Sequence, residues 1–341
     1  MAGGPYYHIV GCHDDRFVLK KSLAARNYLI PAASRPGFTS ALRRIIKSER
    51  IDLTIPNSDR EVGTFSALRK RLPCRMFLPD KKVIDLCQDK YALTTFLRRQ
   101  GLPAPRTYSI RSFSEIDDLF RRFTKRERLW CRIRRGSGSF GAIPVVNPDQ
   151  VRAWITYWKR MRGVAMREFI LSEYLPGRDF CVELLWQNGT LILAKMAQRL
   201  VYIENGSPSG TSSTPALAKT VLEPHVLEVC TRAIRTLDPR TSGIFFLDIK
   251  ENGAGEPCIT EINAGRFPMI TAIFDLTGKY NMAATYVRLA MNRVAEVEGP
   301  CDYEKDCYLV RSLDTLPAIF RGDELLDGIQ DIRRSIGQSG R

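Results

Sequence analysis

The chain has 341 residues, of which 44% are hydrophobic and 26% are charged, and these ordinary globular values exclude intrinsic disorder as the default expectation. Its length predicts two or three subdomains rather than one. No stretch approaches the roughly 20 uninterrupted apolar residues of a membrane helix. The segment from Met1 to Tyr7 also lacks the charged-then-apolar pattern of a secretory signal. We therefore expect a cytoplasmic protein without membrane contacts.

The formal net charge of +15 is the unusual value in the composition, and it would favour polyanions such as nucleic acid. Much of the excess lies in an arginine- and lysine-rich stretch between residues 121 and 167, which flanks a glycine-rich loop. A basic rim around a nucleotide-phosphate site explains part of it, and a solvated basic surface explains the remainder. Because no RNA- or DNA-binding signature accompanies the charge, we do not expect nucleic acid as a partner.

The nine cysteines contain no C-x-x-C pair, and none of the three histidines has a zinc-like spacing with them. We expect reduced and mostly buried thiols. No transition-metal site is expected.

Strand-like and helix-like segments alternate over the first 80 residues. Apolar runs at 7–12, 51–56 and 76–78 predict short strands, and apolar residues at helical spacing predict helices at 38–49 and 59–71. This alternation predicts a parallel sheet covered on both faces, in a small α/β domain over residues 1–80. The chain starts almost directly with the first strand, and the glycine-rich turn that often precedes it is missing. We therefore expect a shortened domain, either natural or from an upstream start site.

Beyond residue 80 the pattern changes to α+β. Residues 80–100 are expected to be rich in helix and to stop at Gly101-Leu102-Pro103-Ala104-Pro105, a boundary between domains. Further strands are expected at 129–133, 142–146, 169–174, 179–186, 190–198, 243–251 and 256–262, and further helices at 113–123, 148–162 and 223–236. We expect one subdomain over 81–176 and another over 177–341, with a loop at 204–214 and a frayed tail after residue 337.

The first chemical motif is the loop Arg134-Arg135-Gly136-Ser137-Gly138-Ser139-Phe140-Gly141, between two expected strands. Glycines let backbone N–H groups approach phosphate oxygens, the serines add hydroxyl donors and the arginines add charge. The loop lacks the Lys-Ser/Thr ending of a P-loop and does not open a helix as a dinucleotide fingerprint would. Taken alone, it is equally compatible with a flexible β-hairpin turn.

The second motif is a pair of strands that carry oxygen ligands, Asp248-Ile249-Lys250 and Thr260-Glu261-Ile262-Asn263. Because alternate residues of a strand share a face, Glu261 and Asn263 point together and Asp248 can face them from the neighbouring strand. Buried carboxylates need a cation, and oxygen-only ligands suit Mg²⁺ bound together with substrate phosphates. The alternative is a solvated hairpin end with capping acids. Arg266, just beyond, could reach a transferred phosphoryl group or an acyl phosphate.

The third motif is Glu173-Tyr174-Leu175-Pro176-Gly177-Arg178-Asp179, which predicts a strand that leaves its sheet into a Pro-Gly turn. The exposed backbone of such a turn suits the edge of adenine, while Glu173 and Asp179 could accept hydrogen bonds from the amino group and the ribose hydroxyls. Taken alone, this motif is an ordinary β-turn.

In this order and at these separations, the three motifs resemble the ATP-grasp superfamily over roughly residues 80–295, and the preceding α/β unit extends the resemblance to nearly the whole chain. The resemblance implies an α/β and α+β protein with an ATP-grasp fold, using ATP and Mg²⁺, with Mn²⁺ as an alternative ion. The implied nucleotide-binding residues are Lys90, Arg132, Gly136, Ser137, Gly138, Ser139, Gly141, Glu173, Leu175 and Asp179, and the implied metal ligands are Asp248, Glu261 and Asn263. The run 260–267 is most similar to stand-alone proteins related to the large chain of carbamoyl-phosphate synthetase.

The implied activity is that of an ADP-forming carboxylate–amine ligase. A carboxylate oxygen would attack the γ-phosphorus, and an amine or other nucleophile would then displace phosphate from the acyl phosphate, with Arg199 and Arg266 as candidates for stabilising the developing charge. Two alternatives stay open: an enzyme that forms carbamoyl or carboxy phosphate from bicarbonate, and a catalytically silent nucleotide sensor or nucleic-acid-binding module. The expected partners are a small-molecule carboxylate and an amine, and a homodimer is left open.

Overall fold

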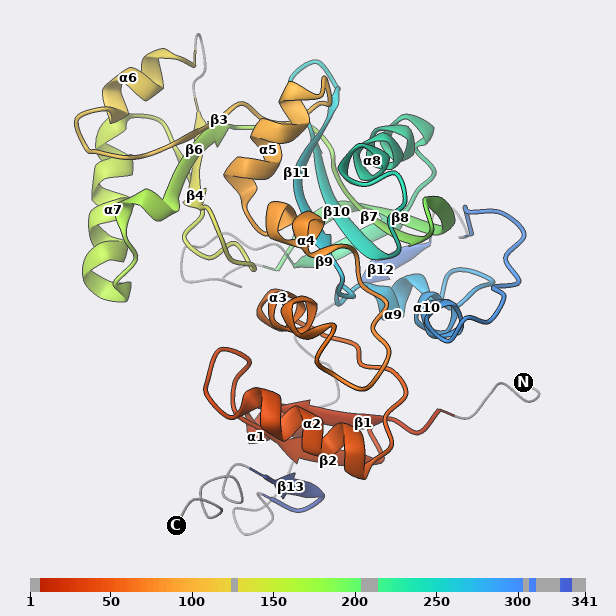
Figure 1. The fold of residues 1–341 in the computed structure, drawn as a ribbon. Helices are drawn as coiled ribbons and strands as arrows, with labels where there is room; N and C mark the ends of the chain where they lie inside the picture. The colour runs from red at the N-terminus through yellow and green to blue at the C-terminus, as the bar shows by residue number, and fades with distance from the viewer. Residues whose placement is uncertain (1–6, 124–127, 204–213, 303–306, 311–325, 333–341) are drawn as a thin grey trace. The chain divides into compact units, whose positions relative to one another are not determined.

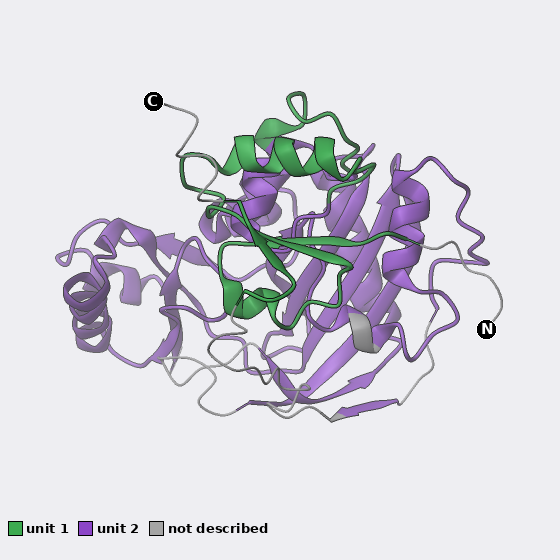
Figure 2. Cartoon of the chain, turned by 90° about the horizontal axis from the view of Figure 1, so that it is seen from below, with its two compact units in different colours: residues 1–54, 67–76, 313–341 green, residues 55–66, 77–312 purple. Residues whose placement is uncertain are grey.

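The computed structural model describes residues 7–123, 128–203, 214–302, 307–310 and 326–332 (Figure 1). The chain divides into two compact units (Figure 2). Unit 1 comprises residues 1–54, 67–76 and 313–341, and unit 2 comprises residues 55–66 and 77–312. The subdomain boundaries expected at residues 80 and 176 stay predictions.

Unit 1 contains a three-stranded parallel sheet in the order β1-β2-β13. The strands are β1 (Val10–His13), β2 (Arg26–Leu29) and β13 (Ile329–Asp331), and the helices are α1 (Arg16–Leu19) and α2 (Phe38–Ser48). One face of α2 is buried through Phe38, Ala41, Leu42, Ile45 and Ile46. This spacing is that of an amphipathic helix with one face in a core. The expected parallel sheet in the N-terminal region is confirmed.

Two of the expected N-terminal strands are wrong. Residues 51–56 make only an isolated bridge between Leu53 and Arg75, and residues 76–78 form no strand. The amide of Thr54 donates to the carbonyl of Arg75, but Pro56 has no N–H with which to extend the ladder. The sheet is instead completed by β2 and by β13, which comes from the C-terminal part of the chain. β2 was not predicted because it begins with polar residues.

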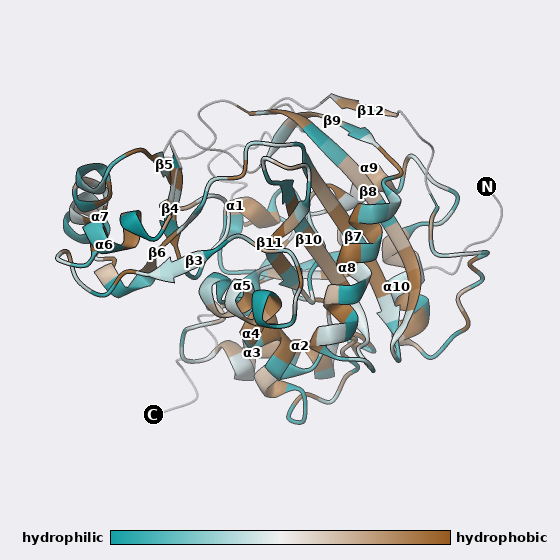
Figure 3. Ribbon diagram, turned by 90° about the horizontal axis from the view of Figure 1, so that it is seen from above, coloured by the Kyte–Doolittle hydropathy of each residue, from teal (hydrophilic) through white to brown (hydrophobic). Residues whose placement is uncertain are grey.

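The larger sheet of unit 2 has six strands in the order β11-β10-β7-β8-β9-β12, with all neighbours antiparallel. They are β7 (Asp179–Gln187), β8 (Thr190–Tyr202), β9 (Pro215–Thr220), β10 (Gly243–Glu251), β11 (Pro257–Ala264) and β12 (Tyr308–Val310). The central strands β7 and β10 are almost wholly buried, and they are largely apolar in Figure 3. Sheets buried on both faces are expected to read as near-continuous apolar runs.

Helices cover both faces of this sheet. Arg235 of α8 (Pro224–Leu237) lies 5.7 Å from the ring of Trp186, whereas Phe274 at the end of α9 (Thr271–Phe274) packs with Cys181 on the opposite face of β7. α10 (Met282–Ala290) also packs against β7. The remaining helices of unit 2 are α4 (Lys81–Cys87) and α5 (Lys90–Arg99), which both pack against β11, and the first part of α3 (Asp59–Leu68).

A second, four-stranded antiparallel sheet in unit 2 has the order β3-β6-β4-β5. Its elements are β3 (Thr107–Ser109), α6 (Ile116–Arg121), β4 (Leu129–Ile133), β5 (Ile143–Val145), α7 (Pro148–Arg162), the 3₁₀ turn η1 (Met166–Glu168) and β6 (Phe169–Glu173). A core of buried residues that includes Ile116, Cys131, Ile155 and Trp158 joins the two helices to the sheet. The predicted strand 129–133 and helix 148–162 are confirmed to the residue.

Within the described part of the chain, no helix combines the length and the apolar character needed to cross a bilayer. The expected frayed tail after residue 337 lies outside the described residues, as does nearly all of the loop expected at 204–214. The mixed class expected from the sequence, α/β with α+β, is confirmed by the parallel sheet of unit 1 and the antiparallel sheets of unit 2.

Candidate functional site

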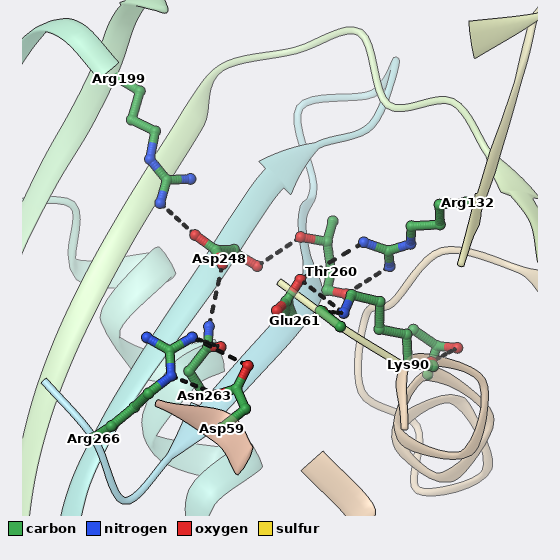
Figure 4. Close-up of polar contacts among 11 residues, drawn as sticks. Asp59, Lys90, Arg132, Arg199, Asp248, Thr260, Glu261, Asn263 and Arg266 are labelled. Carbon is green, nitrogen blue, oxygen red and sulfur yellow. Dashed lines mark hydrogen bonds and ion pairs between the residues drawn. The ribbon is translucent and has the colours of Figure 1, made fainter. Parts of the chain in front are cut away.

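Two carboxylates face each other across the strands β10 and β11. Asp248 is the direct cross-strand neighbour of Glu261, and a β-bulge follows at Ile249. Asn263 lies two residues beyond Glu261 on the same face, with its amide nitrogen 3.5 Å from Oδ2 of Asp248 (Figure 4). Like charges directly opposite each other destabilise a sheet, so this pair requires positive charge nearby. The register places the three side chains on one face of the two strands, as strand alternation predicted, and their role as metal ligands stays a prediction.

Arg199 supplies the positive charge on the side of Asp248. From β8 its Nη2 donates to Oδ1 of Asp248 and its Nη1 lies 3.1 Å from Oδ1 of Asp179 (Figure 4). Burial alone would lower the pKa of Arg199, but the neighbouring carboxylates of Asp248 and Asp179 raise it above its usual value. The side chain therefore stays charged and joins three adjacent strands at one place.

Lys90 and Arg132 supply positive charge on the side of Glu261. Nζ of Lys90, the first residue of α5, is 3.5 Å from Oε2 of Glu261 and donates to the carbonyl oxygen of Gly136. Arg132 of β4 is 3.9 Å from the same carboxylate oxygen and donates to the carbonyl of Thr260 at 2.9 Å (Figure 4). Burial lowers the pKa of Arg132, and Glu261 and Asp248 oppose that shift. Lys90 of α5 and Arg132 of the smaller sheet thus meet Glu261 of the larger sheet.

The glycine-rich loop connects β4 to β5 directly beside these cations. Gly138 and Gly141 have left-handed φ values of 68° and 69°, and Ser139 follows with a φ of 57°. A Cβ on Gly141 would lie 2.5 Å from Cδ1 of Ile133, whereas a Cβ on Gly138 would meet nothing within 4 Å. The loop is anchored at its start, because the amide of Lys90 donates to the carbonyl of Arg134 at 3.1 Å. The remaining predicted loop residues, Gly136 and Ser137, lie on the same turn.

Asp89 strengthens that anchor. Its carboxylate accepts from Nε of Arg134 at 2.6 Å, from Nη2 of Arg135 at 3.0 Å and from the amide of Ala92 at 3.1 Å, so it also caps α5. Burial alone would raise the pKa of Asp89, but these donors, led by Arg134, hold it below its usual value. The two loop arginines are therefore partly neutralised and fixed in place.

Arg266 contacts Asn263, next to the two carboxylates. Its Nη2 donates to Oδ1 of Asn263 at 2.6 Å, and its Nε donates to the carboxylate of Asp59 on α3 (Figure 4). Asp59 is a residue that the sequence reasoning missed, because nothing near it in the sequence marks it as part of a site. Arg266 itself is placed where the sequence predicted, beside the proposed metal ligands.

Residues 87–267, more than half of the chain, match the family model of the ATP-grasp domain. The chain belongs to the ATP-grasp family. Comparison with curated proteins finds no match.

Solved ATP-grasp structures share the fold at low sequence identity. The biotin carboxylase domain of Hydrogenobacter thermophilus 2-oxoglutarate carboxylase, solved with MgADP and bicarbonate, has a TM-score of 0.68 at 13% identity and covers 88% of this chain and 67% of its own. N5-carboxyaminoimidazole synthetase from Staphylococcus aureus, solved with ADP, has a TM-score of 0.66 at 11% identity, covering 87% and 73%. The L-amino acid ligase from Bacillus licheniformis has a TM-score of 0.62 at 11% identity, covering 80% of this chain. The chain spans 64% of the length of that ligase. The predicted ATP-grasp fold is thereby confirmed.

The residues predicted to hold adenine and ribose are part of the ATP-grasp domain but already have protein partners. The carboxylate of Glu173, at the end of β6, accepts from the backbone amide of Arg106 at 2.8 Å. Leu175 is buried with 5% exposure. Asp179, the first residue of β7, accepts from Arg199 and from the hydroxyl of Tyr202. Asp179 therefore lies two strands from Glu261 in the same network, whereas Glu173 belongs to the smaller sheet, and their nucleotide roles stay predictions.

A fully buried carboxyl lies further along the same face of the ATP-grasp sheet. Glu183 of β7 is fully buried, accepts from Oγ1 of Thr271 at 2.6 Å and leaves its Oε2 without a hydrogen-bond partner among the described residues. Its cross-strand neighbour Lys195 instead bonds Asp275 and the carbonyls of Phe274 and Tyr280. Burial raises the pKa of Glu183 to about 8.

The donor set fits a magnesium ion held together with a nucleotide. Asp248, Glu261 and Asn263 offer only oxygen ligands, as Mg²⁺ prefers. Among the described residues no group of three or more His, Cys, Asp and Glu could hold a metal. An ion here would thus depend on the amide of Asn263 and on ligand phosphates. The buried Nε atoms of Arg132 and Arg199 also have no hydrogen-bond partner among the described residues, so each keeps a donor that a phosphate oxygen could accept.

Proposed function

We propose that this chain is an ATP-dependent ligase that activates a carboxylate substrate as an acyl phosphate, which an amine or other nucleophile then attacks, with release of ADP and phosphate. The observation that carries the proposal is the meeting of Asp248, Glu261 and Asn263 with Lys90, Arg132, Arg199 and Arg266 inside an ATP-grasp domain. Phosphoryl transfer demands this kind of site, because it depends mainly on positioning and on neutralising charge.

The cations of the site would hold the phosphates. Lys90 and Arg132 lie beside the glycine-rich loop, whose backbone can approach phosphate oxygens closely, and both now bond to Glu261 and to carbonyl oxygens. In the proposal they exchange these contacts for phosphate oxygens when nucleotide binds. Arg266, which is held by Asp59 and Asn263, would stabilise charge on the transferred phosphoryl group.

Asp248, Glu261 and Asn263 would hold the Mg²⁺ ion. When bound, the ion neutralises charge on the outer phosphates and orients them. Arg199 then keeps a second partner in Asp179, so its charge stays compensated if Asp248 turns toward a metal. No side-chain nucleophile is required by this chemistry.

The finer assignments are also proposals. The relatives that share the fold carry different substrates in their names, L-amino acid ligase and biotin carboxylase, so the fold does not select the substrate. The similarity of residues 260–267 to carbamoyl-phosphate synthetase leaves carboxy phosphate as a second candidate product. A small-molecule acid, an amine acceptor and MgATP are the proposed partners.

The test has a binding stage and a turnover stage. MgADP binding is measured by calorimetry for the wild-type chain, for Glu261→Gln and for the matched control Glu256→Gln at the exposed turn after β10. We expect Glu261→Gln to weaken binding by about tenfold or more and the control to change it by less than about twofold. ADP release is then measured with each of a panel of carboxylic acids and amino acids, alone and with amines, and with bicarbonate.

The outcomes separate the candidates. ADP release that requires both an acid and an amine supports the ligase, whereas release with bicarbonate alone supports the carboxy-phosphate-forming enzyme. Tight MgADP binding that the Glu261 variant does not weaken would show that the nucleotide lies elsewhere and would overturn the site. Tight binding with no release across the panel would favour a nucleotide sensor.

A further inference from the structure

A basic groove lies in unit 1, outside the ATP-grasp domain. Its volume is about 610 Å³, and its lining residues are Arg43, Ile46, Lys47, Arg50, Ile51, Arg71 and Pro73. Four of the seven carry positive charge and none is acidic. Ile51 and Pro73 supply apolar surface to the groove, and Ile46 lies beneath it with 3% exposure.

The four cations have no acidic partner among the described residues. No ion pair to Arg43, Lys47, Arg50 or Arg71 occurs among the described residues, although Arg43 donates to the carbonyl oxygen of Arg71 at 3.1 Å and so ties the helix to the neighbouring segment. Like charges at this spacing repel one another, and an anion would relieve that repulsion. Cations near the end of a helix are favoured by its carbonyl groups, which explains Lys47 and Arg50. The helix carbonyls do not account for the cation at Arg43, which lies one turn earlier in α2, or for the cation at Arg71, which comes from another segment.

The backbone of Arg50 has a strained conformation. It follows the end of α2 with a φ of 53°, a left-handed conformation that favours glycine or asparagine after a helix. A residue other than glycine costs free energy in this conformation, and the surrounding structure has to offset that cost. Arg50 lines the groove together with Arg43 and Lys47 of α2.

We infer that this groove binds a small organic phosphate ester. Guanidinium groups match phosphate oxygens through paired hydrogen bonds, and the isoleucine and proline surface suits an organic part. A groove of this volume accommodates one small molecule rather than a nucleic-acid strand. The inference does not depend on the proposed ligase activity, because the groove belongs to unit 1 and the acidic site to unit 2.

Ligand-observed NMR with phenyl phosphate and with inorganic phosphate tests the inference, using the full chain saturated with MgADP so that the proposed nucleotide site is filled. The triple variant Arg43→Gln/Lys47→Gln/Arg71→Gln removes three charges from the groove. The triple variant Arg16→Gln/Arg35→Gln/Lys70→Gln removes three charges elsewhere in unit 1 and is the matched control. MgADP binding and the thermal transition of each variant verify that it is folded.

The groove variant is expected to weaken phenyl phosphate binding by about tenfold or more, and the control by less than about threefold. Phenyl phosphate should also bind several-fold more tightly than inorganic phosphate. Equal weakening in both variants would mean that only general positive charge attracts the probe and would overturn the site. Equal affinity for phenyl phosphate and inorganic phosphate would overturn the assignment to an organic ester. If the groove instead bound single-stranded DNA more tightly than phenyl phosphate, with a strong dependence on salt, the surface would be assigned to nucleic acid.

Discussion

Asp59, at the start of α3, holds the guanidinium group of Arg266, which lies 207 residues further along the chain. The two side chains make a second contact at 3.4 Å, between Nη2 and Oδ2. Arg266 also donates to Asn263, so Asp59 fixes the arginine that is proposed to meet the transferred phosphoryl group and, through it, a proposed metal ligand. A residue from outside the segment that matches the ATP-grasp domain therefore contributes to the geometry of the proposed catalytic site.

Replacement of Asp59 by asparagine is predicted to slow turnover while leaving nucleotide affinity almost unchanged. The variant keeps the size of the side chain but removes the charge that orients Arg266, an effect of about 1.4 kcal/mol or about tenfold in kcat. The KM for ATP should change by less than about twofold, because Lys90 and Arg132 are untouched. Steady-state ADP release measures both constants. Asp85→Asn, which removes the exposed partner of Lys81, is the control, and an equal loss in that variant would contradict a positioning role.

The acidic strands were predictable from the sequence, and the reason is local. Alternation along a strand and a glycine turn between two strands suffice to bring Asp248, Glu261 and Asn263 to one face, as the register confirms. Arg132 was predicted to hold phosphate, but its contact with the carbonyl of Thr260 could not be, because it joins two different sheets. Asp59 was missed for the same reason.

The strands of the N-terminal region were harder to predict from the sequence, because a segment forms a strand only if another strand pairs with it. The apolar run at 51–56 looks more like a strand than the polar β2 does, yet β2 pairs with both β1 and β13. No local pattern reveals that a segment near residue 330 supplies the third strand. Glu183 was missed because one polar residue in a buried apolar strand carries no signal of its surroundings.

Loss of Arg199 is predicted to destabilise the fold as well as the site. Asp248 and Asp179 would then be left as partly buried carboxylates without their shared cation, and Arg199→Gln should cost about 3 kcal/mol. Arg199→Lys keeps the charge but loses the planar fork that reaches both carboxylates, so an intermediate loss is expected. Thermal unfolding of the wild type and of the two Arg199 variants measures the order of their stabilities. Arg121→Gln, which breaks an exposed pair with Asp118, should change stability by less than about 0.5 kcal/mol.

Two glycines of the loop form a matched pair for testing its packing. Gly138 and Gly141 have nearly the same φ, but only a Cβ on Gly141 would collide with Ile133. Gly138→Ala should cost about 1 kcal/mol from backbone conformation alone, whereas Gly141→Ala should cost clearly more and disturb ATP binding. Thermal unfolding and MgADP calorimetry provide the two readouts. Equal costs in the two variants would show that the loop moves away from Ile133 without penalty.

The buried carboxyl of Glu183 makes stability depend on pH in a defined direction. Its pKa of about 8 in the folded chain lies above the 4.5 of an unperturbed glutamate, so between these values the folded state holds a proton that the unfolded state has lost. Stability from this group is therefore complete below about pH 4.5 and is lost as the pH rises toward 8, by at most about 1.4 kcal/mol per pH unit. This sign is opposite to that of a carboxylate stabilised by an ion pair.

Glu183→Gln is predicted to cancel that loss, because glutamine keeps the hydrogen bond with Thr271 and never ionises. The melting temperature of the variant minus that of the wild type should rise by several degrees between pH 5 and pH 8, since each 1 kcal/mol shifts the melting temperature of a unit this size by roughly 2–4 °C. The control is Glu298→Gln, where Lys279 holds the pKa of an exposed carboxyl below its usual value, so its difference should be flat over that range. A flat difference for Glu183→Gln as well would mean that Glu183 is already ionised in the folded chain at pH 5 and that burial does not raise its pKa.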